Sequence, residues 1–249
     1  MAGHSKWKQI KRKKAVTDAR RGASWTKVIR EITVAARAGG GDPGANPRLR
    51  TAIDAAKAVN MPGDNIDRAI KKGTGELEGA TYEEITYEGY GPGGAAIILE
   101  ATTDNSTRTV AGSRHAFSRN GGNLGSANSV AWMFDRKGQI LVDAGRYPED
   151  STLEAALEAG AEDFIRDGDQ YLISTAVPTF HSVQDALRQR GIEAESAELA
   201  LVPKTTVRLE GKQAEQMLRL VEALEELDDV SKVFSNFDID ASQLAEASN

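Results

Sequence analysis

The 249-residue sequence contains no cysteine. Disulfide bonds, thiolate metal ligands and cysteine nucleophiles are therefore excluded. No uncharged apolar window approaches the roughly eighteen residues or more that a membrane span needs. The basic N-terminus is not followed by an apolar segment, so it does not resemble a secretory signal. We expect a cytoplasmic protein without a membrane partner, in which the glycosylation triplet Asn105-Ser106-Thr107 would meet no glycosylation machinery.

Signatures of catalysis and of metal binding are scarce. The histidines are His4, His115 and His181, which lie far apart and show no metal-ligand spacing such as HExxH. The stretch Gly89–Gly94 (GYGPGG) lacks the Gly-Lys-Ser/Thr ending of a phosphate-binding loop and leads into an apolar, strand-like run, so it predicts a structural turn. The acidic run Glu225–Asp229 (EELDD) is interpreted as a solvated corner after a helix. We expect no enzyme, no cofactor and no bound metal.

Positive charge is concentrated at one end of the chain. Residues 1–75 hold 17 Lys and Arg against 6 Asp and Glu, a net charge of +11. The rest of the chain holds 14 against 31, a net of −17, which gives the overall charge of −6. Such an asymmetry indicates a segment that faces a polyanion, although a solvated basic tail is the simpler alternative.

The basic opening stretch MAGHSKWKQIKRKK suggests contact with nucleic acid. Lysine and arginine side chains neutralise phosphates and release counterions, which gives salt-sensitive affinity without sequence preference. Trp7 is placed either to stack on a base or to pack against the helices that follow. The candidate nucleic-acid-binding residues are His4, Lys6, Trp7, Lys8, Lys11, Arg12, Lys13, Lys14, Arg20, Arg21, Lys27, Arg30, Arg48, Arg50, Lys71 and Lys72.

The first 76 residues are predicted to form a basic arm (1–23) and a helical bundle (24–76). The bundle sequence contains three runs in which apolar residues recur at helical spacing, the first of which ends at a Gly-Gly-Gly stretch. The arm has no such apolar stripe. Ordering it therefore costs conformational entropy that a binding partner has to offset.

Local signals define the ends of the second and third helices. Asn46 is placed to cap the second helix, with Pro47 at its first position. The third helix follows MPGDN, with acidic residues early and basic residues late, as the helix dipole favours. We expect Gly73 to end it.

Residues 77–136 mix strand and helix patterns. Residues 83–88 alternate as a strand does, and the run AAIILEA predicts a central strand buried on both faces. Asp104 or Ser106 is expected to cap the helix that follows, and alternation over 130–134 predicts a further strand.

The remaining sequence predicts two ferredoxin-like units. Residues 137–203 show the order strand-helix-strand-strand-helix-strand, in which STLE at 151–154 forms a capping box. Residues 204–239 add a strand, a helix and a strand, which we combine with 77–136 into a second, discontinuous unit; residues 240–249 form a tail. The fold class is thus α+β and multidomain: a basic helical bundle followed by two ferredoxin-like α/β units, one inserted in the other.

Several ordered motifs resemble the YebC family across essentially the whole chain. They are GHSKW, KKAVTDARRG, AARAGGGDP, NPRLR, MPGDNIDRAIKKG, YEGYGPGG and TDN. The family includes the mitochondrial translational activator of cytochrome oxidase. The resemblance implies a helical N-terminal domain and two α/β domains, one inserted into the other. It also implies a role either in DNA-binding transcriptional regulation or in assisting translation at the ribosome.

The residues favour RNA over sequence-specific duplex recognition. No helix-turn-helix with a readable recognition helix is evident, and no dimerising heptads accompany the basic region. The aromatic signature of RNA-recognition domains is also absent, so Trp132 and Phe134 are assigned to packing. Our hypothesis is a non-catalytic factor that docks on ribosomal RNA or tRNA, and so on the ribosome, through its arm and bundle. The alternatives are a DNA-binding transcriptional regulator and a protein-interaction scaffold.

Overall fold

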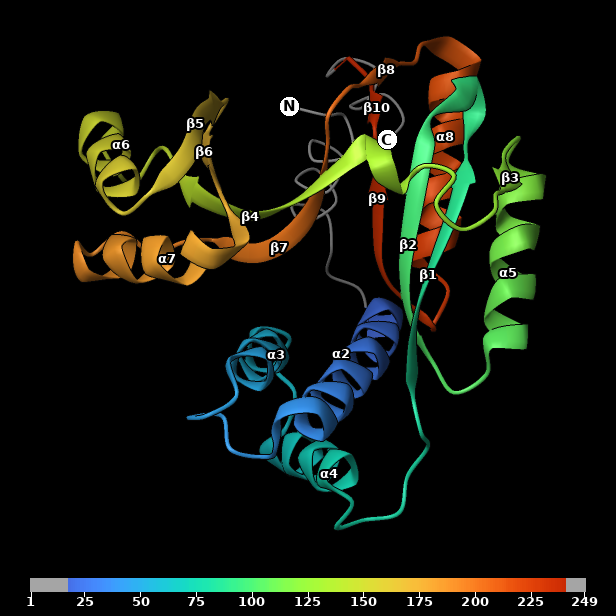
Figure 1. Cartoon of the computed structure of the whole chain (residues 1–249), viewed down its shortest axis with the longest axis horizontal. Coiled ribbons are helices and arrows are strands. Elements are labelled where there is room, and N and C mark those ends of the chain that lie inside the picture. The colour runs from blue at the N-terminus through green and yellow to red at the C-terminus, as the bar shows by residue number, and fades with distance from the viewer. Residues whose placement is uncertain (1–17, 241–249) are drawn as a thin grey trace. The chain divides into compact units, whose positions relative to one another are not determined.

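The computed structural model describes residues 18–240, with side chains from Trp25 onward. It confirms the α+β class, since helices accompany several mainly antiparallel sheets (Figure 1). Two compact units are present. One is the continuous segment Trp132–Thr206, and the other contains the described residues on both sides of it, up to Ala131 and from Val207.

The outer unit begins with three packed helices, α2 (Asp18–Gly39), α3 (Pro47–Ala58) and α4 (Gly63–Thr74). Helix α2 contacts both of the others. Their shared core contains the fully buried Ile32, Ala35 and Leu49. The helical spacing of apolar residues in the sequence thus corresponds to one buried stripe on each helix.

Asn46 joins two of these helices, and its predicted capping role is confirmed. Its side-chain oxygen accepts a hydrogen bond from the backbone N–H of Leu49, 3.1 Å away, and Pro47 is the first residue of α3. The side-chain nitrogen of Asn46 donates to the carbonyls of Ala35 and Gly40 near the end of α2. One buried amide therefore satisfies backbone groups at the end of one helix and at the start of the next.

The prediction that Gly73 ends the third helix is wrong. Helix α4 continues to Thr74, and its C-cap is Gly75, which has the left-handed φ of 86° that favours glycine. Gly73 is buried against α2 instead. A Cβ atom at this position would lie 2.4 Å from the carbonyl oxygen of Thr33 and 2.7 Å from Cβ of Ala36. Glycine is present because the two helix backbones approach closely.

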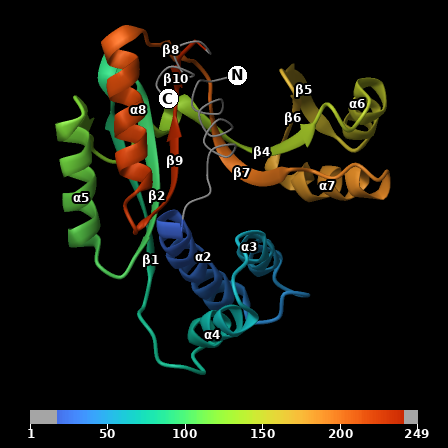
Figure 2. The same ribbon diagram turned by 180° about the vertical axis from the view of Figure 1, so that it is seen from behind.

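The outer unit contains a four-stranded antiparallel sheet with the order β3-β1-β2-β9. Its elements are β1 (Glu83–Tyr90), β2 (Ala96–Thr103), α5 (Ser106–Arg119), β3 (Asn123–Leu124), β8 (Val207–Arg208), α8 (Gly211–Glu225), β9 (Val230–Ser235) and β10 (Phe237–Asp238). Strands β8 and β10 form a separate parallel pair. Helices α5 and α8 pack against the sheet (Figure 2), and Leu99, Phe117 and Val221 are fully buried between these layers. Strand β2 is almost entirely buried, as its apolar run predicted.

The predicted strand at 130–134 is not part of this sheet. Residues Ala131–Met133 form a short 3-10 helix, and Phe134 begins β4 of the inserted unit. The carboxylate of Glu88 accepts hydrogen bonds from the backbone N–H groups of Asn128, Val130 and Ala131. These N–H groups are therefore bonded to a side chain and not to the backbone of a neighbouring strand. The outer sheet therefore does not have the strand membership that we predicted. Packing is also the wrong assignment for Trp132, whose side chain is 65% exposed.

The glycine-rich stretch after β1 is a structural turn, as expected. Pro92–Gly94 forms a 3-10 turn between β1 and β2. Gly93 and Gly94 have positive φ angles of 68° and 77°, and a Cβ at Gly93 would lie 2.4 Å from the Leu209 side chain. The conformation and the close packing both require glycine.

The inserted unit has the predicted ferredoxin-like order. Its elements are β4 (Phe134–Asp143), α6 (Glu149–Glu158), β5 (Ala161–Asp167), β6 (Gln170–Thr175), a 3-10 turn at Val177–Thr179, α7 (Phe180–Gln189) and β7 (Ser196–Pro203). The sheet order is β5-β6-β4-β7 and each neighbouring pair is antiparallel. The predicted capping box is wrong, because α6 begins at Glu149 and the Ser151 hydroxyl donates to the carbonyl of Pro148.

We expect the Gly73→Ala substitution to destabilise the outer unit. The added methyl group would meet backbone and side-chain atoms of α2, so α2 and α4 would have to separate. The expected loss is about 1–3 kcal/mol in the free energy of unfolding, measured by urea denaturation. Gly63→Ala is the matched control, since nothing lies within 4 Å of a Cβ added there. Equal losses in the two variants would contradict this account.

Candidate nucleic-acid interface

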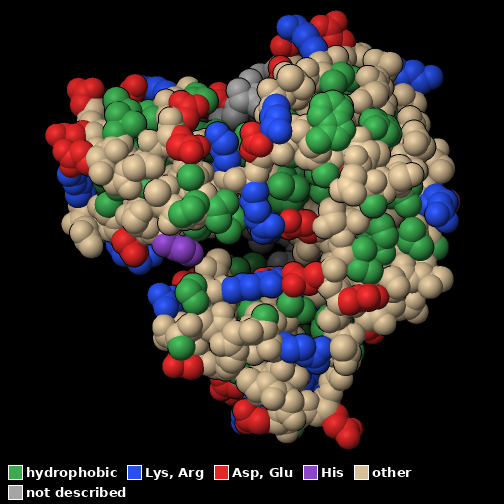
Figure 3. All heavy atoms as spheres, viewed as in Figure 1, with side chains coloured by type: hydrophobic (Ala, Val, Ile, Leu, Met, Phe, Trp, Pro, Cys, Tyr) green, Lys and Arg blue, Asp and Glu red, His purple; other side chains and the backbone are tan. Residues whose placement is uncertain are grey.

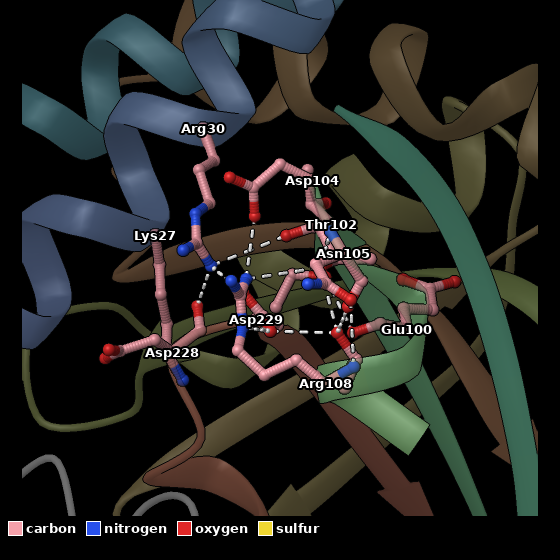
Figure 4. Close-up of polar contacts among 12 residues, drawn as sticks. Lys27, Arg30, Glu100, Thr102, Asp104, Asn105, Arg108, Asp228 and Asp229 are labelled. Atoms are coloured by element: carbon pink, nitrogen blue, oxygen red, sulfur yellow. Dashed lines mark hydrogen bonds and ion pairs between the residues drawn. The ribbon is translucent and has the colours of Figure 1, made fainter. Parts of the chain in front are cut away.

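A buried carboxylate lies at the turn between α8 and β9. Asp229 is only 6% exposed, so the interpretation of the EELDD run as a solvated corner is wrong for its last residue. The side chain faces α2 and α5, where two arginines converge on it (Figure 4). A carboxylate removed from water in this way has to be neutralised by charged donors.

Asp229 accepts hydrogen bonds from two different helices. From α2, the Arg30 guanidinium lies 2.8 Å from Oδ1. From α5, Arg108 binds both oxygens, with Nη2 2.8 Å from Oδ1 and Nε 3.0 Å from Oδ2. The Thr109 hydroxyl donates to Oδ2 at 2.8 Å. Arg30 also donates to the carbonyls of Thr102 and Asp228, so the network connects the helical bundle to the sheet.

The electrostatics agree with this geometry. Burial alone would raise the pKa of Asp229. The hydrogen bonds from Arg108 and Thr109, together with the charge of Arg30, outweigh burial and hold the pKa of Asp229 below its ordinary value. The pKa of Arg108 is correspondingly raised, chiefly by its hydrogen bonds to Asp229 and Asp104. The lowered pKa of Asp229 and the raised pKa of Arg108 keep this pair charged near neutral pH.

The TDN motif builds the start of α5. Asn105 is the N-cap, because its side chain accepts the Arg108 N–H at 3.0 Å; the predicted caps Asp104 and Ser106 are both wrong. Asp104 instead pairs with the Arg108 side chain at 2.7 Å, and the Thr103 hydroxyl accepts the backbone N–H of Asn105. The motif thus orients Arg108 toward Asp229. Neither Arg108 nor Asp229 was among the predicted site residues, and the TDN motif was the only local signal.

Half of the predicted nucleic-acid contacts lie outside the described residues. They are His4, Lys6, Trp7, Lys8, Lys11, Arg12, Lys13 and Lys14. Arg20 and Arg21 fall in the first turns of α2, but their side chains are also outside the described part. Their role in phosphate binding stays a prediction.

Four predicted cations of the bundle have partners inside the chain. Arg30 pairs with Asp229, and the Lys27 ammonium donates to the carbonyl of Glu225. Arg48 pairs with two carboxylates, and Arg50 donates to two loop carbonyls. The Arg48 distances are 2.8 Å to Glu31 and 2.6 Å to Glu84, and the Arg50 partners are the Pro43 and Gly44 carbonyls. Some of these contacts lie within the bundle and others join it to the α/β part of the outer unit. Phosphate binding by the same residues stays a prediction.

Lys71 and Lys72 are placed differently. Both lie in the last turn of α4, where cations favour the helix dipole, and Lys71 is exposed. Neither has an ion-pair partner among residues 25–240. Of the predicted cations whose side chains are described, these two are the most available to an external phosphate.

Other kinds of site find little support in the described part of the chain. No set of three or more His, Asp or Glu side chains is positioned there to hold a metal ion. None of its helices combines the length and the apolar composition needed to cross a membrane.

Comparison with known proteins identifies close relatives. Residues 5–76 match the family described as the TACO1/YebC protein N-terminal domain, and residues 82–237 match the TACO1/YebC second and third domain. A "probable transcriptional regulatory protein" of Gemmatimonas aurantiaca is 62% identical over 99% of this chain and 100% of its own length. A protein of the same description from Trichlorobacter lovleyi is 55% identical, with 98% of each chain covered.

A solved structure supports the fold. The conserved hypothetical protein Aq1575 of Aquifex aeolicus superposes with a TM-score of 0.83 and is 48% identical. The match covers 90% of this chain and 92% of the Aquifex chain. The two proteins therefore share both the fold and extensive sequence similarity.

Asp229→Asn should destabilise the outer unit strongly. The substitution keeps the shape of the side chain but leaves Arg30, which is 12% exposed, without a charged partner. We expect a loss of about 3 kcal/mol in the free energy of unfolding, measured by denaturant titration. Asp228→Asn is the control, because Asp228 is exposed and accepts the Arg30 hydrogen bond through its main-chain carbonyl, which the substitution leaves in place. A loss for Asp229→Asn no larger than for the control would contradict this prediction.

The contribution of Asp229 should disappear in acid. Its folded-state pKa lies below the ordinary value, so its stabilising effect is complete above the unfolded pKa of about 3.9 and is lost as the pH falls through and below that value. The difference in unfolding free energy between the unsubstituted protein and Asp229→Asn should therefore be constant from pH 7 to about 5 and shrink below about 4. A difference that grows on acidification would contradict a folded-state pKa of Asp229 below its ordinary value.

Proposed function

The chain belongs to the TACO1/YebC family, and we propose that it is a non-catalytic regulator of gene expression that binds nucleic acid. Its curated relatives, described as probable transcriptional regulatory proteins, support the regulatory class. The observation that carries nucleic-acid binding is the separation of charge, with +11 on residues 1–75 and −17 on the remainder. Such a distribution favours a polyanionic partner for the N-terminal part.

The main phosphate contacts are assigned to the basic arm. Arg30, Arg48 and Arg50 are engaged inside the chain, and using them for phosphate would break contacts within the bundle and between the bundle and the outer sheet. We therefore assign binding chiefly to the basic residues of the arm, from Lys6 to Arg21, with Lys71 and Lys72 as a second contribution. Each phosphate neutralised by this set adds to the salt dependence of binding.

RNA is the favoured target. A helix that reads the major groove presents donors and an electropositive face to the bases. The exposed positions of α4 instead alternate in sign, with Asp64 and Asp67 beside Arg68 and Lys71. In the view of Figure 3, blue and red side chains lie next to one another over the helices of the bundle. Backbone contact by a basic arm suits a structured RNA, so we propose docking on ribosomal RNA or tRNA in support of translation.

A DNA-binding transcriptional regulator is the second candidate. The descriptions of the bacterial relatives favour it, and it would use the same cations. It differs in the expected target, because it requires preference for duplex DNA over structured RNA. A protein-interaction scaffold, the third alternative, requires neither.

Removing the arm charges should release the protein from ribosomes. We expect the quadruple alanine variant of Lys11, Arg12, Lys13 and Lys14 to shift from the ribosomal fractions of a low-salt sucrose gradient to the free pool. The control replaces Arg146, Arg166, Arg188 and Arg190 of the inserted unit with alanine, which removes the same charge. Gel shifts with tRNA and with duplex DNA complete the measurement.

Each result separates the candidates. Loss of ribosome and tRNA binding by the arm variant alone would support the proposal. Preference of the unsubstituted protein for duplex DNA would favour the second candidate. Recovery of the unsubstituted protein only in the free pool, with no tRNA binding, would overturn the proposed function.

A further inference from the structure

We propose that the exposed face of α5 and the loop after it form a second contact surface for an RNA backbone, centred on Arg114 and Arg119. This inference rests on the proposed function, because it assumes an RNA target. It adds a binding surface in the part of the chain that is otherwise acidic.

The sequence around α5 is positively charged, whereas the chain beyond residue 75 is acidic as a whole. Beyond residue 75 the chain carries 31 Asp and Glu, yet none lies between Asp104 and Asp135. The same stretch contains Arg108, Arg114 and Arg119, together with His115. An acid-free segment of this kind lowers the repulsion that a phosphate backbone would meet elsewhere on the α/β part.

The structure places these cations on the solvent side of the helix. Ser113, Ala116 and Phe117 are buried toward the sheet and α8, whereas Arg114 and Arg119 are exposed. At about 100° per residue, the two arginines project about 140° apart around the helix axis. The exposed positions between them are Thr107, Arg108, Ala111, His115 and Ser118. Arg108 is held by Asp104 and Asp229, and three of the other four positions carry small side chains. A sugar-phosphate strand can therefore approach α5 closely, with an arginine on each flank.

Arg114 and Arg119 are not used in ion pairs within the described part of the chain. Among residues 25–240, neither has an ion-pair partner, in contrast to Arg108, which binds Asp104 and Asp229. The helix dipole accounts for Arg119 in the last turn but not for Arg114, which is farther from the end. A phosphate would thus gain two cations without displacing an internal carboxylate.

The loop after α5 is preorganised for contact with a backbone. Glu88 holds it in place, because the carboxylate accepts the N–H groups of Asn128, Val130 and Ala131 at 2.7, 2.7 and 2.8 Å. Gly121 and Asn128 have positive φ angles of 78° and 64°, and both are exposed. The exposed side chains here are small, and those of Asn123, Ser126 and Asn128 can donate to phosphates and 2′-hydroxyls.

The neighbouring helix α8 provides a matched comparison. It exposes Lys212 and Arg219, but Arg219 faces Glu215 at 3.8 Å and the same helix carries two further glutamates. Mixed charge makes α8 a poor phosphate surface, although it lies beside α5 in the same unit. Removing two cations from α8 therefore tests for effects of net charge alone.

The experiment compares full-length variants in binding to tRNA and to purified ribosomes over a range of salt concentrations. R114A/R119A removes the proposed contacts, R114K/R119K keeps their charge, and K212A/R219A is the α8 control. We expect R114A/R119A to bind about tenfold more weakly at low salt, with the slope of log K against log salt reduced by about 1.5. The lysine variant should retain most of the affinity, and the control should stay within about twofold of the unsubstituted protein. Circular dichroism melting of each variant excludes a folding defect.

The outcomes distinguish this surface from the arm. Unchanged affinity and slope in R114A/R119A would overturn the inference, even where the quadruple arm variant loses binding. Loss in R114A/R119A with full binding by the arm variant would support the inference and contradict the arm assignment. An equal loss of RNA affinity in the α8 control would overturn the assignment of this face as an RNA surface. So would a loss of affinity in R114A/R119A that is confined to duplex DNA, used as a parallel probe. Absence of any RNA binding by the unsubstituted protein would overturn both proposals.

Discussion

A carboxylate that has almost no contact with water has to be neutralised where it lies. Asp229 is neutralised by Arg30 from α2 and by Arg108 from α5, while Thr109 supplies a further hydrogen bond. Because these donors come from separate parts of the chain, one ion-pair network positions the middle of α2, the start of α5 and the turn before β9. The helical bundle and the outer sheet consequently belong to one compact unit.

The features that could be predicted from the sequence are those decided within a few residues. Asn46 and Pro47 were identified correctly because a helix start depends on its own side chain and on the next turn. The ferredoxin-like order of the inserted unit could also be predicted, since that unit is continuous. The Asp229 network could not be predicted, because its arginines are distant in sequence and an acidic residue after a helix is typically solvated. Gly73 was misinterpreted because a close helix crossing and a helix end both select glycine.

The structure also divides the basic residues into two groups that the sequence does not distinguish. Arg30 and Arg48 resemble the other cations of the bundle in sequence, but in the fold each bonds to carboxylates. Lys71, Arg114 and Arg119 are exposed, and residues 25–240 offer them no ion-pair partner. A positively charged residue contributes to phosphate binding only when the folded chain has not already neutralised it. The distribution of such residues, more than the total charge, therefore defines where a polyanion can bind.

The insertion has a consequence for the order in which the chain can fold during synthesis. Strand β2 pairs with β9, so Ile97 is aligned with Ser235, although the entire inserted unit is translated between them. The inserted unit is continuous and can close its own sheet while the outer sheet still lacks an edge strand. Until the last strands emerge, Arg30 and Arg108 have no Asp229 to bind and β2 has an unpaired edge. Completion of the outer unit, with the bundle attached to it, is thus a late step that depends on the C-terminal segment.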